Sequence, residues 1–331
     1  MLGAIAPEDA RRYAVPRPLP SPCPRGNVSD METREGIVGA IDGGRASVHL
    51  ARVAADLARV LAAPLTLVHV VGAMPDMRGE AGADPLWPAN SRLVVGPGEG
   101  PEVDASRMLE RVGQAIGEPG AGRHVVPFGD PGRQVAKLAE AWGSQLIVVG
   151  TRGNAPVTDA LGRVSSRLAA DAPCPVLVIP QGLESHIRPL TWRTRTLVCG
   201  FDGSVPAWSA AARAADLASR LGGSLRLVNT GAGIGTDAVR DLLGQLSDAA
   251  ARRGVAVAPR EVQFEQRSGD PSDELERVAA TATAPLIAVG SRGLDPPQAP
   301  LLGSVCGRLL QHARRPIMVV PATSASPEPA A

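Results

Sequence analysis

A glycine-rich stretch near the C-terminal end of the chain has the residue types and spacing of a phosphate-binding loop. Gly290 and Gly293 are separated by two residues, nine residues follow Gly293, and Gly303 is followed directly by Ser304. Glycines allow the backbone to approach a phosphate closely, and amides at a helix start present N–H donors with a favourable dipole. The hydroxyl of Ser304 adds a donor, so the spacing predicts a phosphate site. A Gly-x-x-Gly taken alone would serve equally well as a turn between a strand and a helix.

Two aspartates stand at equivalent places in the chain and are candidates to hold a polar ligand. Asp42 and Asp202 each follow an apolar run and each precede a glycine, which is typical of a turn that opens a helix. The Asp202 carboxylate could act as a base or bind Mg²⁺. Because no second catalytic group lies beside Asp202 in the sequence, we expect this residue to bind a ligand without hydrolysing it.

The aspartates and glycines belong to a repeat that runs along the chain. The block IVGAIDGG at 37–44 returns as LVCGFDGS at 197–204, an offset of 160 residues. The block LIVVGTRG at 146–153 returns as LIAVGSRG at 286–293, an offset of 140 residues. Five such blocks recur in one order, so we expect two copies of one domain. The difference in offset, 160 − 140 = 20, places about 20 extra residues of the first copy within 72–101.

Short apolar runs rich in valine and isoleucine alternate with helical patterns in both copies. The segments 47–62 and 206–221 place apolar residues three and four apart, as a helix packed on a sheet requires. Asp130 and Asp270 precede prolines at expected helix starts, where an acidic cap and an early proline both fit. Unbroken apolar runs indicate strands buried on both faces. The predicted fold class is α/β, with two tandem doubly wound domains, each a five-stranded parallel sheet flanked by helices.

The repeat also sets the expected domain boundaries. A proline-dense stretch precedes the first copy, and the end of the chain is small, polar and proline-containing. Met31 lies just beyond the proline-dense stretch, and both Met1 and Met31 stay open as the start of translation. We expect a flexible arm at 1–34, a first domain at 35–180, a linker at 181–192, a second domain at 193–321 and a flexible tail at 322–331.

Composition argues against several classes of partner. Aromatic residues make up only 2% of the chain and the net charge is +1, so there are few rings for stacking bases and no basic field for nucleic acid. No apolar run approaches the roughly 18 residues of a membrane span. The cysteines are too far apart for a zinc site or a dense disulfide framework: Cys23, Cys174, Cys199 and Cys306. We therefore expect a cytoplasmic protein with reduced cysteines that binds neither nucleic acid nor membrane.

The second copy resembles the universal stress protein family. The pattern Gly-x2-Gly-x9-Gly-(Ser/Thr) that begins at Gly290 is similar to the ATP-binding signature of that family. The resemblance covers both copies and implies an adenine-nucleotide alpha-hydrolase-like fold that binds ATP, with or without Mg²⁺. It implies that an aspartate after the first strand and backbone after the second hold the adenosine, while the signature holds ribose and phosphates. The residues so implicated are Asp202, Thr230 (through its backbone), Gly290, Gly293, Gly303 and Ser304.

The first copy departs from this pattern. Only eight residues separate Gly153 from Gly162, and Arg163 stands in place of the hydroxyl residue. We expect the shorter loop to displace the amides, while Arg163 could block the site or pair with a phosphate. The altered site of the first copy would be formed more weakly by Asp42, Val70, Gly150, Gly153, Gly162 and Arg163. The second copy is the better candidate, although prolines in 294–302 remove three N–H donors from its loop.

Three functions stay open on these grounds. The first is a regulatory protein, not an enzyme, in which ATP changes the affinity for an unidentified protein partner. The second is a slow ATPase or nucleotidyl-transfer enzyme, and the third is an interaction module that binds no nucleotide. In the family the last strand often mediates pairing. We therefore expect 175–179 and 316–320 to form an internal pseudo-dimer, and association into a homodimer is a further option.

Two other features suggest chemistry only weakly. The run Gly231-Ala-Gly233-Ile-Gly235 resembles a dinucleotide fingerprint, but its third glycine comes one position early and the first copy has no equivalent. His69 lies inside an expected strand, where a structural hydrogen bond is a more common role than catalysis.

Overall fold

The computed structural model describes parts of both repeated halves. The described residues are 36–44, 46–71, 101–118, 121–126, 129–151, 162–183, 185–231, 240, 244, 262–293, 302–312 and 314–321. All of them belong to one compact unit, Glu35–Ala331. The expected arm and tail, and the extra residues of the first copy up to residue 100, lie outside the described residues.

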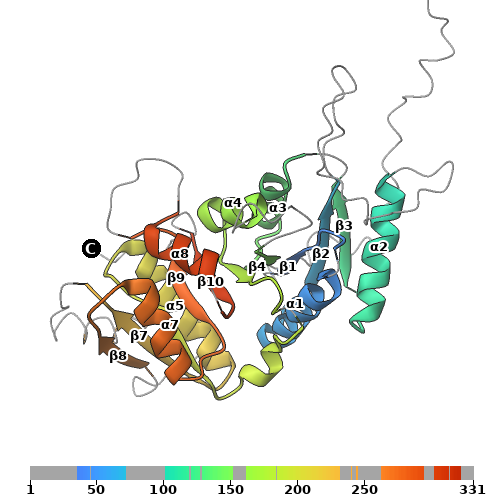
Figure 1. Cartoon of the computed structure of the whole chain (residues 1–331). Helices are drawn as coiled ribbons and strands as arrows, with labels where there is room; N and C mark the ends of the chain where they lie inside the picture. The colour runs from blue at the N-terminus through green and yellow to red at the C-terminus, as the bar shows by residue number, and fades with distance from the viewer. Residues whose placement is uncertain are drawn as a thin grey trace, which may run out of the picture. The chain divides into compact units, whose positions relative to one another are not determined.

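Each half contributes five parallel strands in the same doubly wound order. The first half has the order β3-β2-β1-β4-β5 and the second has the matching order β8-β7-β6-β9-β10. The strands of the first half are β1 (Ile37–Ala40), β2 (Leu65–Val70), β3 (Gly122–Val126), β4 (Leu146–Gly150) and β5 (Val176–Ile179). Those of the second half are β6 (Thr196–Gly200), β7 (Ser224–Asn229), β8 (Val262–Gln266), β9 (Ile287–Gly290) and β10 (Ile317–Val320). The predicted α/β fold class is therefore confirmed (Figure 1).

The last strands of the two halves pair with each other and join the two sheets into one. Strands β5 and β10 are antiparallel, with Ile317 opposite Val178 and Val319 opposite Val176, so the sheet has ten strands. This confirms the predicted pairing of 175–179 with 316–320. Because the pair is antiparallel, the C-terminal ends of the strands in the two halves point to opposite edges of the sheet.

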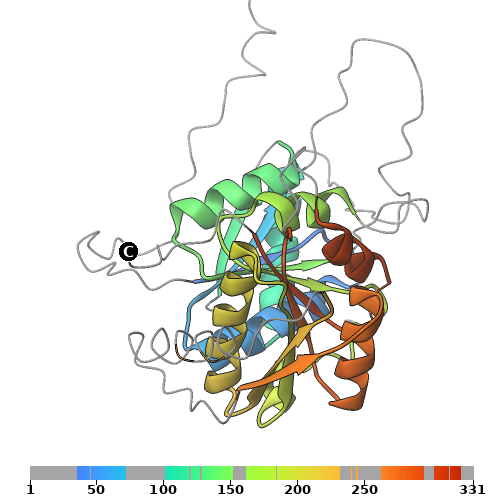
Figure 2. The ribbon, with the colours of Figure 1, turned by 90° about the vertical axis from the view of Figure 1, so that its left-hand side faces the viewer.

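Helices cover both faces of the sheet. One face packs on α1 (Ser47–Leu61), α2 (Pro101–Ala115) and α5 (Val205–Arg220). The other face packs on α3 (Pro131–Ala141), α4 (Arg163–Asp171), α7 (Pro271–Thr281) and α8 (Ser304–His312). In Figure 2, α5 lies on one side of the strands and α7 and α8 lie on the other. The helices expected at 47–62 and 206–221 are confirmed, with ends within one residue.

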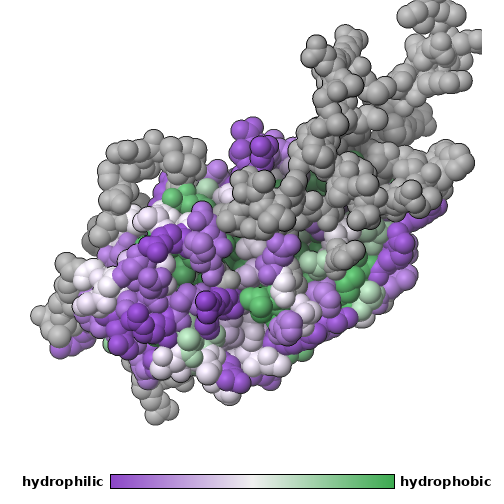
Figure 3. All heavy atoms as spheres, viewed as in Figure 1, coloured by the Kyte–Doolittle hydropathy of each residue, from purple (hydrophilic) through white to green (hydrophobic). Residues whose placement is uncertain are grey.

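Successive strand residues enter different cores, which explains the unbroken apolar runs of the sequence. Ile37 belongs to the core on the α1 face and Val38 to the core on the α3 face. Strands covered on both faces have no position for a polar side chain that reaches water. The described residues on the face seen in Figure 3 are mostly hydrophilic, with apolar residues in small groups. None of the described helices is long and apolar enough to cross a membrane.

Two helix starts are capped as the sequence predicts, and the caps are tied to a neighbouring helix. The carboxylates of Asp130 and Asp270 accept backbone N–H groups at the starts of α3 and α7, and a proline follows each cap. Arg167 of α4 lies 3.5 Å from the Asp130 carboxylate, and Arg308 of α8 lies 2.5 Å from that of Asp270. The repeated pair holds the start of one helix against the next, although exposure limits each pair to about 1 kcal/mol.

The segment expected as a linker contributes to the core. A short 3₁₀ helix, η3 (Pro189–Trp192), packs against α1, and Trp192 is only 4% exposed. Its ring belongs to the same apolar cluster as the inner faces of α1 and α5. At the end of α5, the guanidinium of Arg220 donates to the carbonyl of Leu61 at 3.4 Å. The segment between the halves is therefore anchored by burial of its tryptophan.

Replacing Trp192 by alanine tests this anchor. We expect the free energy of unfolding to fall by roughly 3–5 kcal/mol, because a large buried ring is lost and a cavity is left. The shift is measured as a lower urea midpoint at an unchanged slope. Leu190→Ala, in the same short helix but 42% exposed, is the matched control and should cost less than about 0.5 kcal/mol. Equal losses in the two variants would contradict a core role for Trp192.

Candidate functional site

The candidate site of the second half lies where the strand order reverses. Strands β6 and β9 are neighbours, with Val198 opposite Ile287, although β7 and β8 come between them in the chain. Asp202 follows β6 closely and Gly290 ends β9. In doubly wound sheets, ligands bind beyond the carboxyl ends of the strands at such a reversal. The topology therefore brings these two sequence-predicted residues to the same edge.

Two glycines of the signature are required by close packing at this edge. A Cβ at Gly290 would lie 2.8 Å from the backbone of Pro206 in the first turn of α5. A Cβ at Gly293 would lie 2.7 Å from the Oδ2 atom of Asp202. The contact at Gly290 is with backbone, so only glycine fits there, whereas a Cβ at Gly293 would require the Asp202 carboxylate to turn away. The signature glycines thus allow the loop after β9 to reach the aspartate after β6.

The third glycine closes the loop that starts α8. The N–H of Gly303 donates to the carbonyl of Ser291 at 2.8 Å, and a Cβ at Gly303 would lie 3.2 Å from the Cα of Arg292. Ser304 is the first residue of α8 and is exposed. The start of α8 is therefore held against the end of β9. The prolines expected to stiffen the loop lie within 294–301, outside the described residues.

One oxygen of the Asp202 carboxylate is held by its own turn. Its Oδ1 atom accepts the N–H of Ser204 at 2.9 Å, and the Ser204 hydroxyl accepts the N–H of Ala207 at 3.3 Å to cap α5. The Asp202 side chain is exposed, with Oδ2 on the side of Gly293. The carboxylate is thus oriented by one hydrogen bond while its second oxygen lies beside the signature loop.

The end of β7 lies next to Asp202. Gly200 is opposite Val228 in the β6–β7 pair, and the N–H of Phe201 donates to the carbonyl of Val228 at 2.9 Å. Asp202 lies two residues after the end of β6, and Thr230 directly follows β7. The sequence-predicted set of Asp202, Thr230, Gly290, Gly293, Gly303 and Ser304 is therefore gathered at one edge.

Two thiols of the second half are buried near this edge. Burial, and to a lesser extent the charge of Asp202, raises the pKa of Cys199. Burial raises the pKa of Cys306, in the first turn of α8, to about 12. Both groups therefore stay as neutral thiols at neutral pH, which makes them poor nucleophiles. The described cysteines, Cys174, Cys199 and Cys306, are buried, and none of them forms a disulfide within the described residues.

The first half builds a related but different turn after β1. The Oδ1 atom of Asp42 accepts the N–H of Gly44 at 2.8 Å and the hydroxyl of Ser47 at 3.0 Å. Gly44 stands where the second half has its capping serine, so the hydroxyl that contacts the turn comes from Ser47, three residues later. Val70 ends β2 and Gly150 ends β4, on the same edge as Asp42. Both aspartates therefore accept the N–H of the residue two positions later, and Asp42 accepts the Ser47 hydroxyl in addition.

The shorter loop of the first half does not displace the amide at the start of α4. The N–H of Gly162 donates to the carbonyl of Thr151 at 2.7 Å, matching the bond made by Gly303 in the second half. The expectation that the shorter loop displaces the amides is therefore wrong for Gly162. Arg163, the first residue of α4, is exposed, and Gly153 lies outside the described residues.

Sequence reasoning missed one polar residue at the site edge. Asn229, the last residue of β7, is only 3% exposed, and its side chain binds backbone beside Asp202 and the side chain of Gln266. The signal was present in the repeat, because Asn229 stands in the second copy where the first has His69. His69 itself lies 2.7 Å from the carbonyl of Ile41 through its Nδ1 atom, which agrees with the structural role expected for it.

Comparison with known proteins gives one family for both halves. The model of the Universal stress protein family matches residues 34–180 and again 193–321. A universal stress protein of Mycobacterium tuberculosis is 29% identical over 310 residues, which cover 88% of this chain and 99% of that protein. The crystal structure of a universal stress protein from Archaeoglobus fulgidus has a TM-score of 0.60 at 20% identity and covers 88% of this chain and 99% of that one. A universal stress protein in complex with cAMP matches 39% of this chain at a TM-score of 0.31 and 26% identity, and covers 98% of that protein.

The glycine packing at the site is tested by two alanine substitutions. Gly290→Ala should lower the free energy of unfolding by roughly 1–3 kcal/mol, because the new methyl group overlaps the start of α5. Gly307→Ala, in α8, has nothing within 4 Å of the new methyl group and should raise it by up to about 1 kcal/mol. Both changes are measured by urea unfolding. A stabilising effect at Gly290 would mean that the helix start does not press on β9.

Proposed function

The chain belongs to the universal stress protein family, and we propose that it is a regulatory protein whose second half binds an adenine nucleotide. The nucleotide proposed is ATP, with or without Mg²⁺. We also propose that the protein is cytoplasmic. Its two domains are proposed to span residues 35–180 and 193–321. The function proposed is a change in affinity for a protein partner when the nucleotide binds, as part of a stress response.

The observation that carries the proposal is the glycine cradle between Asp202 and the start of α8. A Cβ would meet Pro206 at Gly290 and the Asp202 carboxylate at Gly293, so glycine brings the loop after β9 directly against the turn after β6. Backbone at such a strand-to-helix edge is the kind of surface that binds phosphate. In the proposed complex, Asp202 and the Thr230 backbone hold the adenosine. Gly290 and Gly293 line the ribose and phosphates. Gly303, whose N–H is bonded to the Ser291 carbonyl, closes the loop, and the N–H and hydroxyl of Ser304 contact the phosphates at the start of α8, where the helix dipole favours negative charge.

The first half is proposed as an altered site. Its residues are Asp42, Val70, Gly150, Gly153, Gly162 and Arg163. The Gly162 N–H donates to the Thr151 carbonyl as the Gly303 N–H does to Ser291, so the start of α4 is placed like that of α8 and its dipole favours an anion. Arg163 replaces a small hydroxyl with a long cation that either fills the site or pairs with a phosphate. We therefore assign the nucleotide to the second half.

Titration of the purified protein with ATP and Mg²⁺ by calorimetry tests this assignment. We expect one site per chain, and we expect Gly303→Val to abolish binding because the side chain enters the tight loop beside Arg292. Gly307→Ala, in the same helix with open space around it, is the control and should bind normally. Two sites per chain would show that the first half binds as well.

Other results would move the assignment to another function. Absence of any binding would support an interaction module whose glycines serve only as turns. Steady release of ADP that is lost in Gly303→Val would support a slow ATPase. For the regulatory part, a partner captured with the protein should bind with different affinity when ATP is present, and equal affinities would contradict it.

A further inference from the structure

The side chain of Asn229 connects three neighbouring strand ends at the second-half site. Its Nδ2 atom donates to the carbonyl of Phe201 at 2.8 Å, directly before Asp202. Its Oδ1 atom accepts the N–H of Gly231 at 3.1 Å. These bonds use both ends of a buried amide, so its orientation is determined by its partners.

Gln266, the last residue of β8, completes the same set. Its Nε2 atom donates to the Oδ1 of Asn229 at 2.9 Å and to the carbonyl of Gly231 at 3.0 Å. Asn229 and Gln266 are also direct neighbours in the β7–β8 register. We call Asn229 and Gln266 the amide clamp. The clamp holds both the N–H and the carbonyl of Gly231.

The clamp leaves the Thr230 peptide groups for a ligand. Within the part of the chain that the structure describes, the N–H and carbonyl of Thr230 make no hydrogen bond. The Asn229 amide takes the Phe201 carbonyl, which is the acceptor that a continued β6–β7 ladder would offer to Thr230. An N–H donor and a carbonyl acceptor are thus held next to Asp202, between one strand end and the clamped Gly231.

The first half lacks this arrangement. His69 stands in place of Asn229, and its Nδ1 atom takes the equivalent contact with the Ile41 carbonyl at 2.7 Å. The residue opposite His69 in the β2–β3 register is Val125, a residue type without a hydrogen-bonding group in its side chain. The difference between the halves therefore lies at the strand ends that would contact the base, in addition to the signature loop.

We propose that Asn229 and Gln266 are positioning residues that fix the Thr230 peptide groups and so select adenine over guanine in the second-half site. This inference rests on the proposed nucleotide binding. Adenine presents an amino donor beside a ring acceptor, which matches a carbonyl and an N–H held in fixed positions. Guanine presents its O6 acceptor where adenine has the donor, so a fixed carbonyl would face another acceptor. A loose peptide could turn to accommodate either base, whereas a clamped one cannot.

The first test uses Gln266→Ala, an exposed residue whose loss leaves the core intact. We expect ATP binding to weaken roughly three- to tenfold, from the loss of hydrogen bonds that order Gly231. GTP binding should change less, so the ratio of ATP to GTP affinity should fall. Binding of inorganic tripolyphosphate should be unchanged, because it contacts only the phosphate part of the site. Affinities are measured by calorimetry on the full chain.

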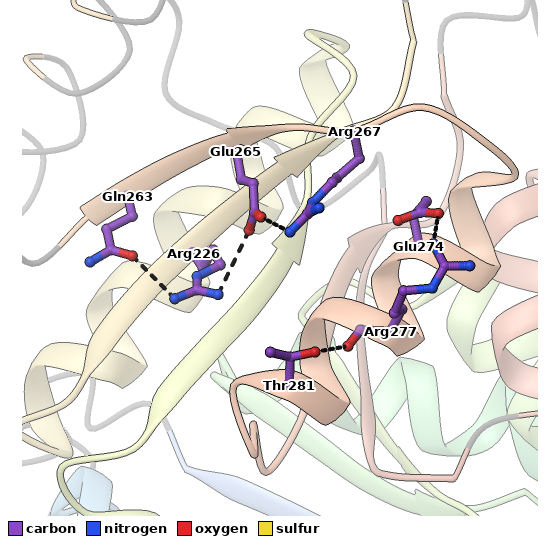
Figure 4. A network of polar contacts seen from close by, with 7 residues as sticks. All are labelled: Arg226, Gln263, Glu265, Arg267, Glu274, Arg277 and Thr281. Atoms are coloured by element: carbon purple, nitrogen blue, oxygen red, sulfur yellow. Dashed lines mark hydrogen bonds and ion pairs between the residues drawn. The ribbon is translucent and has the colours of Figure 1, made fainter.

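The matched control is Gln263→Ala on the same strand. Gln263 binds Arg226 at 3.3 Å, in a polar network with Glu265 and Arg267 that is separate from the clamp (Figure 4). Its replacement should leave all three affinities unchanged. Equal changes in the Gln263 and Gln266 variants would overturn the proposal, since they would indicate a general effect of altering β8.

Asn229→His provides the second variant, because the first half carries histidine at the equivalent position. The imidazole can keep the contact with the Phe201 carbonyl, as His69 does with Ile41, but cannot keep the whole clamp. The ratio of ATP to GTP affinity should fall at least as far as in Gln266→Ala. An unchanged ratio in both variants, with ATP still bound, would overturn the clamp alone. Absence of ATP binding in the unaltered protein would overturn the clamp and the proposed function together.

Discussion

The antiparallel pairing of β5 with β10 is the interaction on which the arrangement of both halves depends. All four residues of each strand are buried. An unpaired strand edge at this depth would leave backbone groups without partners, at a cost of roughly 1–3 kcal/mol for each group. The pairing satisfies both edges and makes one ten-stranded sheet with a core on each face. It also sends the C-terminal strand ends of the two halves to opposite edges, so each half has its own candidate site.

The candidate site of the second half is made mainly of backbone. Gly290 and Gly293 lie where any Cβ would meet Pro206 or Asp202, so the loop after β9 packs against the turn after β6 without side chains between them. Asp202 is oriented by its own turn, and Cys306, in the first turn of α8, is held neutral by burial. A site of this kind suits binding by amides and one carboxylate.

The two halves share a scaffold but differ in the polar groups at its edge. In the first half the Ser47 hydroxyl donates to Asp42, whereas in the second half the Ser204 hydroxyl caps α5. His69 contacts the carbonyl of Ile41, and Asn229 makes the equivalent contact with the carbonyl of Phe201. Each exchange preserves the bond that holds the turn and alters the groups left for a ligand. The changes occur at the ends of β2 and β7 and at the start of α1, and each replacement side chain is hydrogen-bonded, so the scaffold tolerates them.

The sequence by itself determined the repeat, the doubly wound fold, the limits of α1 and α5 within one residue and the caps at Asp130 and Asp270. These follow from periodicity and local hydrogen bonding, which operate over a few residues. Tertiary structure alone decided that Gly293 touches Asp202, that Trp192 enters the core and that Gln266 reaches Asn229. Such contacts depend on strand register and on how helices settle on the sheet. A register shift of one residue between β7 and β8 would turn Gln266 away from Asn229, and no local pattern specifies that register.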